Sequence, residues 1–254
     1  MCGLGYQHDM IECCQDALAI NRFYGGADLF ITATANPNWP EVQQELLPGQ
    51  TAADRRDLVT RVFKLKMDAL LHDIDHGTLG TTVGRVHTIE FQKRGLPHMH
   101  LIVFLHTNSK LRSPEAIDSL ISAEIPEDNN ELQPLVLKFM IHGPCGPFNT
   151  TAPCMEDGNC IRHFPKPFRP QSTLSEDAYA CYRRRNTGTL HQVGRHQIDN
   201  RYVVPYSPYL LLKYRCHINV ESVFSLKSIK YTSTNMSTKE EIGPLSNSAG
   251  ITMK

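Results

Sequence analysis

Residues 86–101 read VHTIEFQKRGLPHMHL, and the pattern in and around them decides the fold. Residues 82–92 and 99–105 both have the apolar, β-branched character of strands. The link at residues 93–97 is short and contains Gly95 and Pro97, which favour a turn between two adjacent strands. The sequence therefore predicts an antiparallel pair of strands joined at this link.

Two histidines, His98 and His100, flank Met99 at the start of the second strand. Alternation along a strand places both imidazoles on one face and directs Met99 to the core. Two neutral imidazoles with a carboxylate suit Mn, Mg, Zn or Fe, and the partner strand offers Glu90, with Gln92 as the alternative. In a chain with 12 histidines, a chance pair is the interpretation that the spacing alone leaves open.

Elements on both sides of this strand pair indicate the fold class. A strand is predicted at Leu29–Thr34, and residues 54–76 repeat apolar residues at helical spacing, with Asp54 as the cap and Gly77 as the terminator. Mixed strands and helices of this kind predict an α+β fold, in which helices flank a central antiparallel sheet.

The later part of the chain continues this mixture. An apolar helix is predicted to end near Ile141, residues 202–220 hold further strands or a helix, and residues 222–231 suit a final helix. We expect residues 1–14 to be flexible, and residues 232–254, which are rich in Ser, Thr and Asn, to be disordered.

Charge is unevenly distributed along the 254 residues, although the formal net charge is zero. Residues 1–160 hold 12 Lys/Arg against 20 Asp/Glu, whereas residues 161–230 hold 12 against 4. The second segment could follow a phosphate backbone, and a solvated basic face is the common alternative.

Five potential soft or borderline metal ligands lie within residues 142–163, in a Gly- and Pro-rich stretch without periodicity. Such a stretch cannot pack on its own, and a tetrahedral Zn²⁺ would supply the missing stability. The chain therefore has a predicted insertion at about 142–170 that a structural zinc stabilises. Its ligands would be Cys145, Cys154, Cys160 and His163, with His142 as the alternative to His163.

The stretch at residues 86–101 closely resembles the His-hydrophobic-His motif of Helitron replication-initiator domains. Residues 28–41, which include Trp39-Pro40-Glu41, are similar to the same family, as are residues 203–221, which end in His217-Ile218-Asn219-Val220-Glu221. The resemblance spans residues 15–231. It implies an HUH-endonuclease domain, whose central sheet is similar to that of RNA-recognition domains.

The resemblance also implies a chemistry. In this family a divalent metal, Mg or Mn, polarises a phosphodiester of single-stranded DNA while a tyrosine attacks it and forms a 5′-phosphotyrosine. Lys230-Tyr231 matches the first tyrosine position of the family, so Tyr231 is the expected nucleophile. The second tyrosine would follow four residues later, where this chain has Asn235.

Other expected DNA contacts are basic. Arg183, Arg184 and Arg185 follow two tyrosines and could bind phosphates, as could Lys230, although a solvated basic turn is the alternative for the arginine run.

The family carries a helicase after this domain, and no Gly-x4-Gly-Lys-Ser/Thr phosphate loop occurs in these residues. The expected partner is single-stranded DNA rather than a membrane, and the substrate implies the nucleus. Two alternatives remain: an inactive DNA-binding remnant, and an unrelated metallohydrolase that uses the histidine pair on water.

Overall fold

The computed structural model describes residues 23–91, 96–146, 148–174, 180–223 and 249–253. Its centre is a five-stranded sheet in the order β10-β1-β3-β2-β11, and every neighbouring pair is antiparallel. These strands are β1 (Leu29–Thr34), β2 (Thr82–Phe91), β3 (Pro97–Leu105), β10 (Ile218–Ser222) and β11 (Ala249–Met253). The predicted α+β class with a central antiparallel sheet is confirmed.

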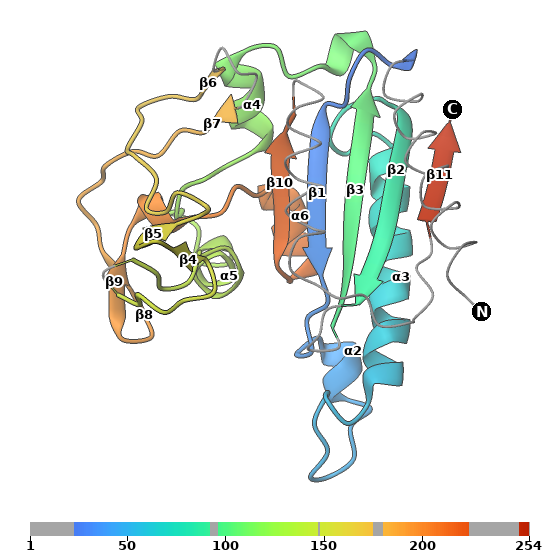
Figure 1. Ribbon diagram of the computed structural model, residues 1–254. Coiled ribbons are helices and arrows are strands. Elements are labelled where there is room, and N and C mark those ends of the chain that lie inside the picture. The colour runs from blue at the N-terminus through green and yellow to red at the C-terminus, as the bar shows by residue number, and fades with distance from the viewer. Residues whose placement is uncertain (1–22, 92–95, 147, 175–179, 224–248, 254) are drawn as a thin grey trace.

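Helices cover one face of this sheet. Helix α3 (Arg56–Asp75) and helix α6 (Pro208–Tyr214) both lie behind the strands in Figure 1. The apolar stripe of α3, which includes Phe63, Met67, Leu70 and Ile74, is buried against the sheet. Full burial stabilises each such side chain by roughly 1.5–3 kcal/mol.

Polar contacts tie the two helices together. The Tyr214 hydroxyl donates to Asp73 at 2.6 Å, and the Lys213 ammonium lies 2.7 Å from the same carboxylate. Trp39, ahead of the short helix α2 (Pro40–Gln43), donates its indole N–H to the Tyr214 carbonyl at 2.8 Å. The helix layer is therefore held by hydrogen bonds as well as by the core.

None of the helices that the structure describes covers the other face of the sheet, which we call the open face (Figure 1). Tyr24 packs on one part of it, against Phe104. A Cβ at Gly84 would lie 2.9 Å from the Tyr24 ring, so only glycine leaves room for this contact. At the other end, the face carries His98 and His100.

The described chain between β3 and α6 forms a lobe beside the β10 edge (Figure 1). Its elements are α4 (Pro114–Leu120), α5 (Leu132–Phe139), β4 (Met155–Glu156), β5 (Asn159–Cys160), β6 (Thr173–Leu174), β7 (Ala180–Cys181), β8 (His191–Val193) and β9 (His196–Ile198). Two short 3-10 helices cover Thr107–Ser109 and Asn200–Tyr202. Among the described residues of the predicted insertion at 142–170, the helices and strands are limited to the two-residue strands β4 and β5.

Several predicted boundaries need correction. The Asp54 side chain does not cap α3, because it accepts hydrogen bonds from Thr51 in the preceding turn and Arg55 occupies the N-cap position. Ser222 ends β10 rather than beginning a helix, and the rest of that predicted helix lies outside the described residues. The tail is not wholly without structure, since β11 pairs with β2.

Candidate functional site

The hairpin of β2 and β3 brings the predicted metal ligands together on the open face. Glu90 on β2 lies opposite His98 on β3. The neighbouring pair on the same face is Thr88 opposite His100. On β3 the intervening Met99 is fully buried in the core, as alternation predicts. Gln92, the alternative ligand, lies outside the described residues.

His100 is held on both sides of its ring. Its Nε2 lies 3.6 Å from Glu90 Oε2, and its Nδ1 lies 3.2 Å from the Thr32 hydroxyl on β1. The contact with His100 lowers the pKa of Glu90 although burial opposes it, so the carboxylate is ionised at neutral pH. The residues therefore present one oriented imidazole beside one anionic oxygen ligand.

His98 differs from His100 because it is 7% exposed and neither ring nitrogen has a hydrogen-bond partner among the described residues. Burial, followed by the positive charges of His100 and His217, lowers the pKa of His98 to about 4. A neutral, buried imidazole without partners is costly unless a ligand pairs with it. This is the protonation state that a metal ligand requires. A divalent metal at Glu90, His98 and His100 stays a prediction, because the group of described residues whose ligand atoms lie close enough together to hold an ion is in the lobe.

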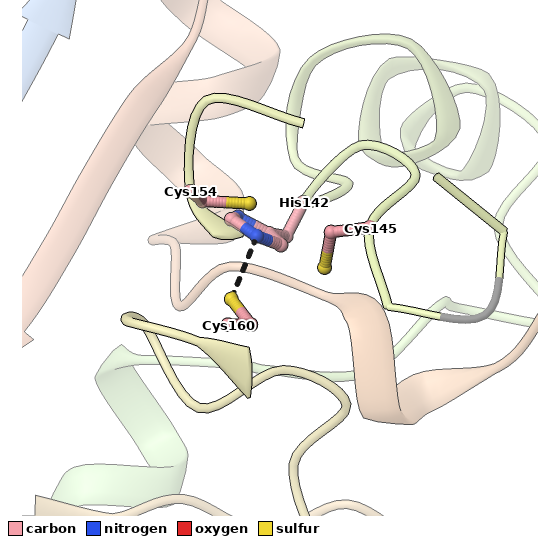
Figure 2. Close-up of side chains that lie close together, drawn as sticks. All are labelled: His142, Cys145, Cys154 and Cys160. Atoms are coloured by element: carbon pink, nitrogen blue, oxygen red, sulfur yellow. Dashed lines mark hydrogen bonds between the residues drawn. The ribbon is translucent and has the colours of Figure 1, made fainter. Parts of the chain in front are cut away.

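A second cluster forms in the lobe. One ligand atom each from His142, Cys145, Cys154 and Cys160 lies within 4.8 Å of all the others. Figure 2 shows the four side chains converging, with His142 Nε2 3.4 Å from Cys160 Sγ. Three thiols and one imidazole at this spacing can hold one tetrahedral metal ion of the zinc type.

Local backbone geometry builds this cluster. The β4–β5 turn places Asp157 and Gly158 at positive φ, and the Cys154 carbonyl accepts a hydrogen bond from the Ile161 N–H at 2.8 Å. His142 follows helix α5, and its backbone N–H donates to the Tyr202 carbonyl at 2.8 Å. A metal here would link the Cys-rich turn to the rest of the fold.

The thiols of the cluster differ in their pKa values. Burial raises the pKa of Cys145 to about 12 and lowers the pKa of His142 to about 4. Burial also opposes ionisation of Cys160, but hydrogen bonds from the Phe164 and Arg162 backbone outweigh it and lower the pKa of that thiol. Cys160 is therefore the thiol best prepared to ionise before a metal binds.

The structure selects His142 rather than His163 for this cluster. His163 is exposed and has a φ of 55°. It lies in the turn after Cys160, and its backbone N–H donates to the Cys160 carbonyl. The cluster therefore contains the alternative histidine, His142, in place of the preferred His163, and zinc binding by it stays a prediction. Spacing could not distinguish the two, because both lie close in sequence to a cysteine.

The arginine run is mostly structural. The Arg184 guanidinium is buried and donates to the carbonyls of Ala123, Asn200 and Val203 at 2.6–3.3 Å. The prediction that Arg184 contacts DNA is corrected, because no phosphate can reach a guanidinium that carbonyls enclose.

The two neighbours of Arg184 are more exposed but paired. Arg185 forms a 2.6 Å ion pair with Glu124, and Arg183 lies 3.3 Å from the same carboxylate and 3.4 Å from Asp118. Sequence reasoning missed Glu124, which is 6% exposed and distant in sequence from the arginines. DNA contacts by Arg183 and Arg185 stay a prediction, and Lys230 and Tyr231 lie outside the described residues.

Residues 4–103 match a family model described as the Helitron helicase-like domain at the N-terminus. No curated protein matches the chain. In the part of the chain that the structure describes, no helix is long and apolar enough to cross a membrane. The matched segment includes β1, α3, β2 and the start of β3 with the histidine pair, and it ends before the Cys/His cluster. The similarity to the Helitron helicase-like domain therefore covers the segment that carries His98, His100 and Glu90.

Proposed function

We propose that this chain is a Helitron-like Rep domain of the HUH-endonuclease type, which nicks and joins single-stranded DNA in rolling-circle transposition. The observation that carries the proposal is the buried His98 imidazole, which has no hydrogen-bond partner among the described residues and lies beside the His100–Glu90 pair. The Helitron match supports it because the matched residues contain all three side chains. The expected place of action is the nucleus, where the DNA is.

The sheet supports a surface site for the substrate. A divalent ion, Mg²⁺ or Mn²⁺, would polarise the scissile phosphate when held by His98, His100 and Glu90. Thr32 and Glu90 orient the His100 ring from opposite sides, so the ligand would not have to reorganise on binding. A single strand would approach the metal from this face, which no described helix covers, and would meet His100 and Glu90, whose side chains are 14% and 35% exposed.

Tyr231 is the proposed nucleophile. Its phenolic oxygen attacks phosphorus, the bond between phosphorus and the 3′ oxygen breaks, and the released 3′-hydroxyl receives the proton. The new phosphotyrosine ester keeps the energy of the broken bond, so a later 3′-hydroxyl can displace the tyrosine and join the strands. A helicase, which the family carries in the same protein, would supply the single strand.

An inactive DNA-binding remnant is the second candidate, and Asn235 favours it. The family pattern has a second tyrosine at that position, which attacks while the first one still holds a strand. A chain with Tyr231 alone would nick DNA but would not complete the exchange. If the helix around Tyr231 is lost, the sheet would bind DNA without cleaving it.

Adduct formation separates these candidates. The protein is incubated with single-stranded DNA and Mn²⁺, and covalent complexes are resolved on a denaturing gel. We expect an adduct that disappears in His98→Ala and Tyr231→Phe and when the metal is chelated. Tyr209→Phe, an exposed residue of α6, and His196→Ala, a half-buried residue of the lobe, are matched controls away from the sheet face, and they should retain the adduct. DNA binding without any adduct would support the inactive remnant instead.

A further inference from the structure

The residue directly before strand β10 brings a third imidazole to the face that carries the histidine pair. Ile218 and Val220 are fully buried in the core between the sheet and its helices. Because side chains alternate along a strand, His217 and Asn219 lie on the open face. Neither has a role in the site as described so far.

The strand register places His217 in the same row as His98. The Thr34 N–H donates to the His217 carbonyl at 2.9 Å, and Thr34 is also the β1 partner of His98. The row across four strands is therefore His217, Thr34, His98 and Glu90.

The spacing in this row suits a shared ligand. Neighbouring strands lie about 4.8 Å apart, so the Cα atoms of His217 and His98 are separated by roughly 10 Å. Only the small Thr34 side chain stands between them. Two imidazoles can span this distance when they share an ion held about 2 Å from each nitrogen.

Both histidines have ring nitrogens without partners among the described residues. His217 Nδ1 is buried and forms no hydrogen bond, like both nitrogens of His98, and Asn219 Oδ1 on the same face is also unpaired. Buried polar atoms are normally satisfied, so several unpaired atoms on one face indicate a ligand that pairs with them. The effect of His217 on the pKa of His98 is consistent with their proximity.

We propose that His217 is a further ligand of the metal ion held by His98, His100 and Glu90, and that it binds from the β10 side. This inference rests on the metal site of the proposed function, but not on the nicking reaction. Three imidazoles are borderline donors and outnumber the one hard carboxylate, so the site should prefer Mn²⁺, Co²⁺ or Zn²⁺ to Mg²⁺.

The test replaces His217 with a ligand that has a spectroscopic signature. The Cys/His cluster is first filled with one equivalent of Zn²⁺, which its thiolates bind more tightly than the histidine site does, and Co²⁺ is then added to wild type and to His217→Cys. A thiolate bound to Co²⁺ gives a charge-transfer absorption in the near ultraviolet, which a nearby but unbound thiol does not give. Glu221→Cys is the matched control, because it lies on the same strand and face, two side-chain rows away.

The inference predicts the new absorption in His217→Cys, its absence in Glu221→Cys, and its loss when His98→Ala is added. His217→Ala, if folded by circular dichroism, should bind Mn²⁺ at least tenfold more weakly than wild type. Co²⁺ bound through His98 without the new absorption would overturn the role of His217 and leave the proposed function intact. If wild type binds no Co²⁺ once the Cys/His cluster holds zinc, the metal site itself is wrong, and this inference fails with it.

Discussion

Protonation of His98 connects the candidate site to stability. Its pKa falls from about 6.5 in an unfolded chain to about 4 in the folded protein, chiefly because the ring is buried. Between pH 6.5 and pH 4, His98 is protonated in the unfolded state but stays neutral in the folded state. The free energy of unfolding should therefore be unaffected above pH 6.5 and should fall as the pH drops toward 4.

Urea denaturation at pH 7 and pH 5 measures this effect. The shift in the pKa of His98 implies a loss of about 2 kcal/mol over that interval, without added metal. His98→Asn removes the titrating group and should show a correspondingly smaller loss. Equal losses in the two proteins would mean that the pKa of His98 is close to its unfolded value.

Arg184 and Arg183 give a matched comparison of a buried and an exposed arginine. In Arg184→Met the carbonyls of Ala123, Asn200 and Val203 lose their donor, so the free energy of unfolding should fall by about 3 kcal/mol. Arg183→Met should cost less than about 1 kcal/mol, since its ion pairs are partly exposed. Equal effects in thermal or urea denaturation would contradict the structural role of Arg184.

The sequence predicts where an individual side chain lies only when the periodicity of a strand or helix determines its position. Alternation along β3 placed His98 and His100 on one face, and hairpin pairing placed Glu90 beside them. No period connects the arginine run to Glu124, so the burial of Arg184 could not be foreseen. His217 could not be assigned either, because its row on the sheet depends on pairing between β10 and β1.

Among the elements, the Cys/His turn depends most on a ligand. Cys145 and Cys160 form only a small buried cluster with Ala152, separate from the main core, and Cys154, Met155 and Phe164 pack against it. A segment with so few apolar contacts gains most of its order from the metal. Removal of zinc should therefore loosen this turn while the sheet stays folded.

Paired histidine substitutions test the ligand set. His142→Ala should weaken Zn²⁺ binding by more than the roughly 10- to 100-fold that loss of an outer-shell partner costs. His163→Ala should leave the affinity and the stoichiometry unchanged, because that ring is outside the cluster. A competition titration with a chromogenic chelator measures both, and the reverse order of effects would restore His163 as the ligand.

Elements were predictable where the pattern is local and long. Strand β1 has the bounds expected from its β-branched residues, and α3 covers Arg56–Asp75 within the predicted 54–76. Strand β11 was missed because its place is decided by pairing with β2 rather than by its own polar, Ser-rich surroundings. The two-residue strands of the lobe have no sequence period at all.

At the scale of the molecule, the two faces of the sheet have different roles. One face packs on α3 and α6 and holds the main core, while the open face presents His98, His100, Glu90 and His217. The lobe beside β10 adds the Cys/His cluster without contributing to that row of residues. Stability and proposed chemistry can therefore be tested by different substitutions.

The most direct test of the account is to identify the residue that becomes joined to DNA. The protein reacts with single-stranded DNA and Mn²⁺, nuclease and protease digestion follow, and mass spectrometry locates the remaining nucleotide. The account predicts a 5′-phosphotyrosine on the peptide that contains Tyr231, absent from His98→Ala. DNA cut to free 5′-phosphate ends with no modified peptide, or a nucleotide on another residue, would contradict it.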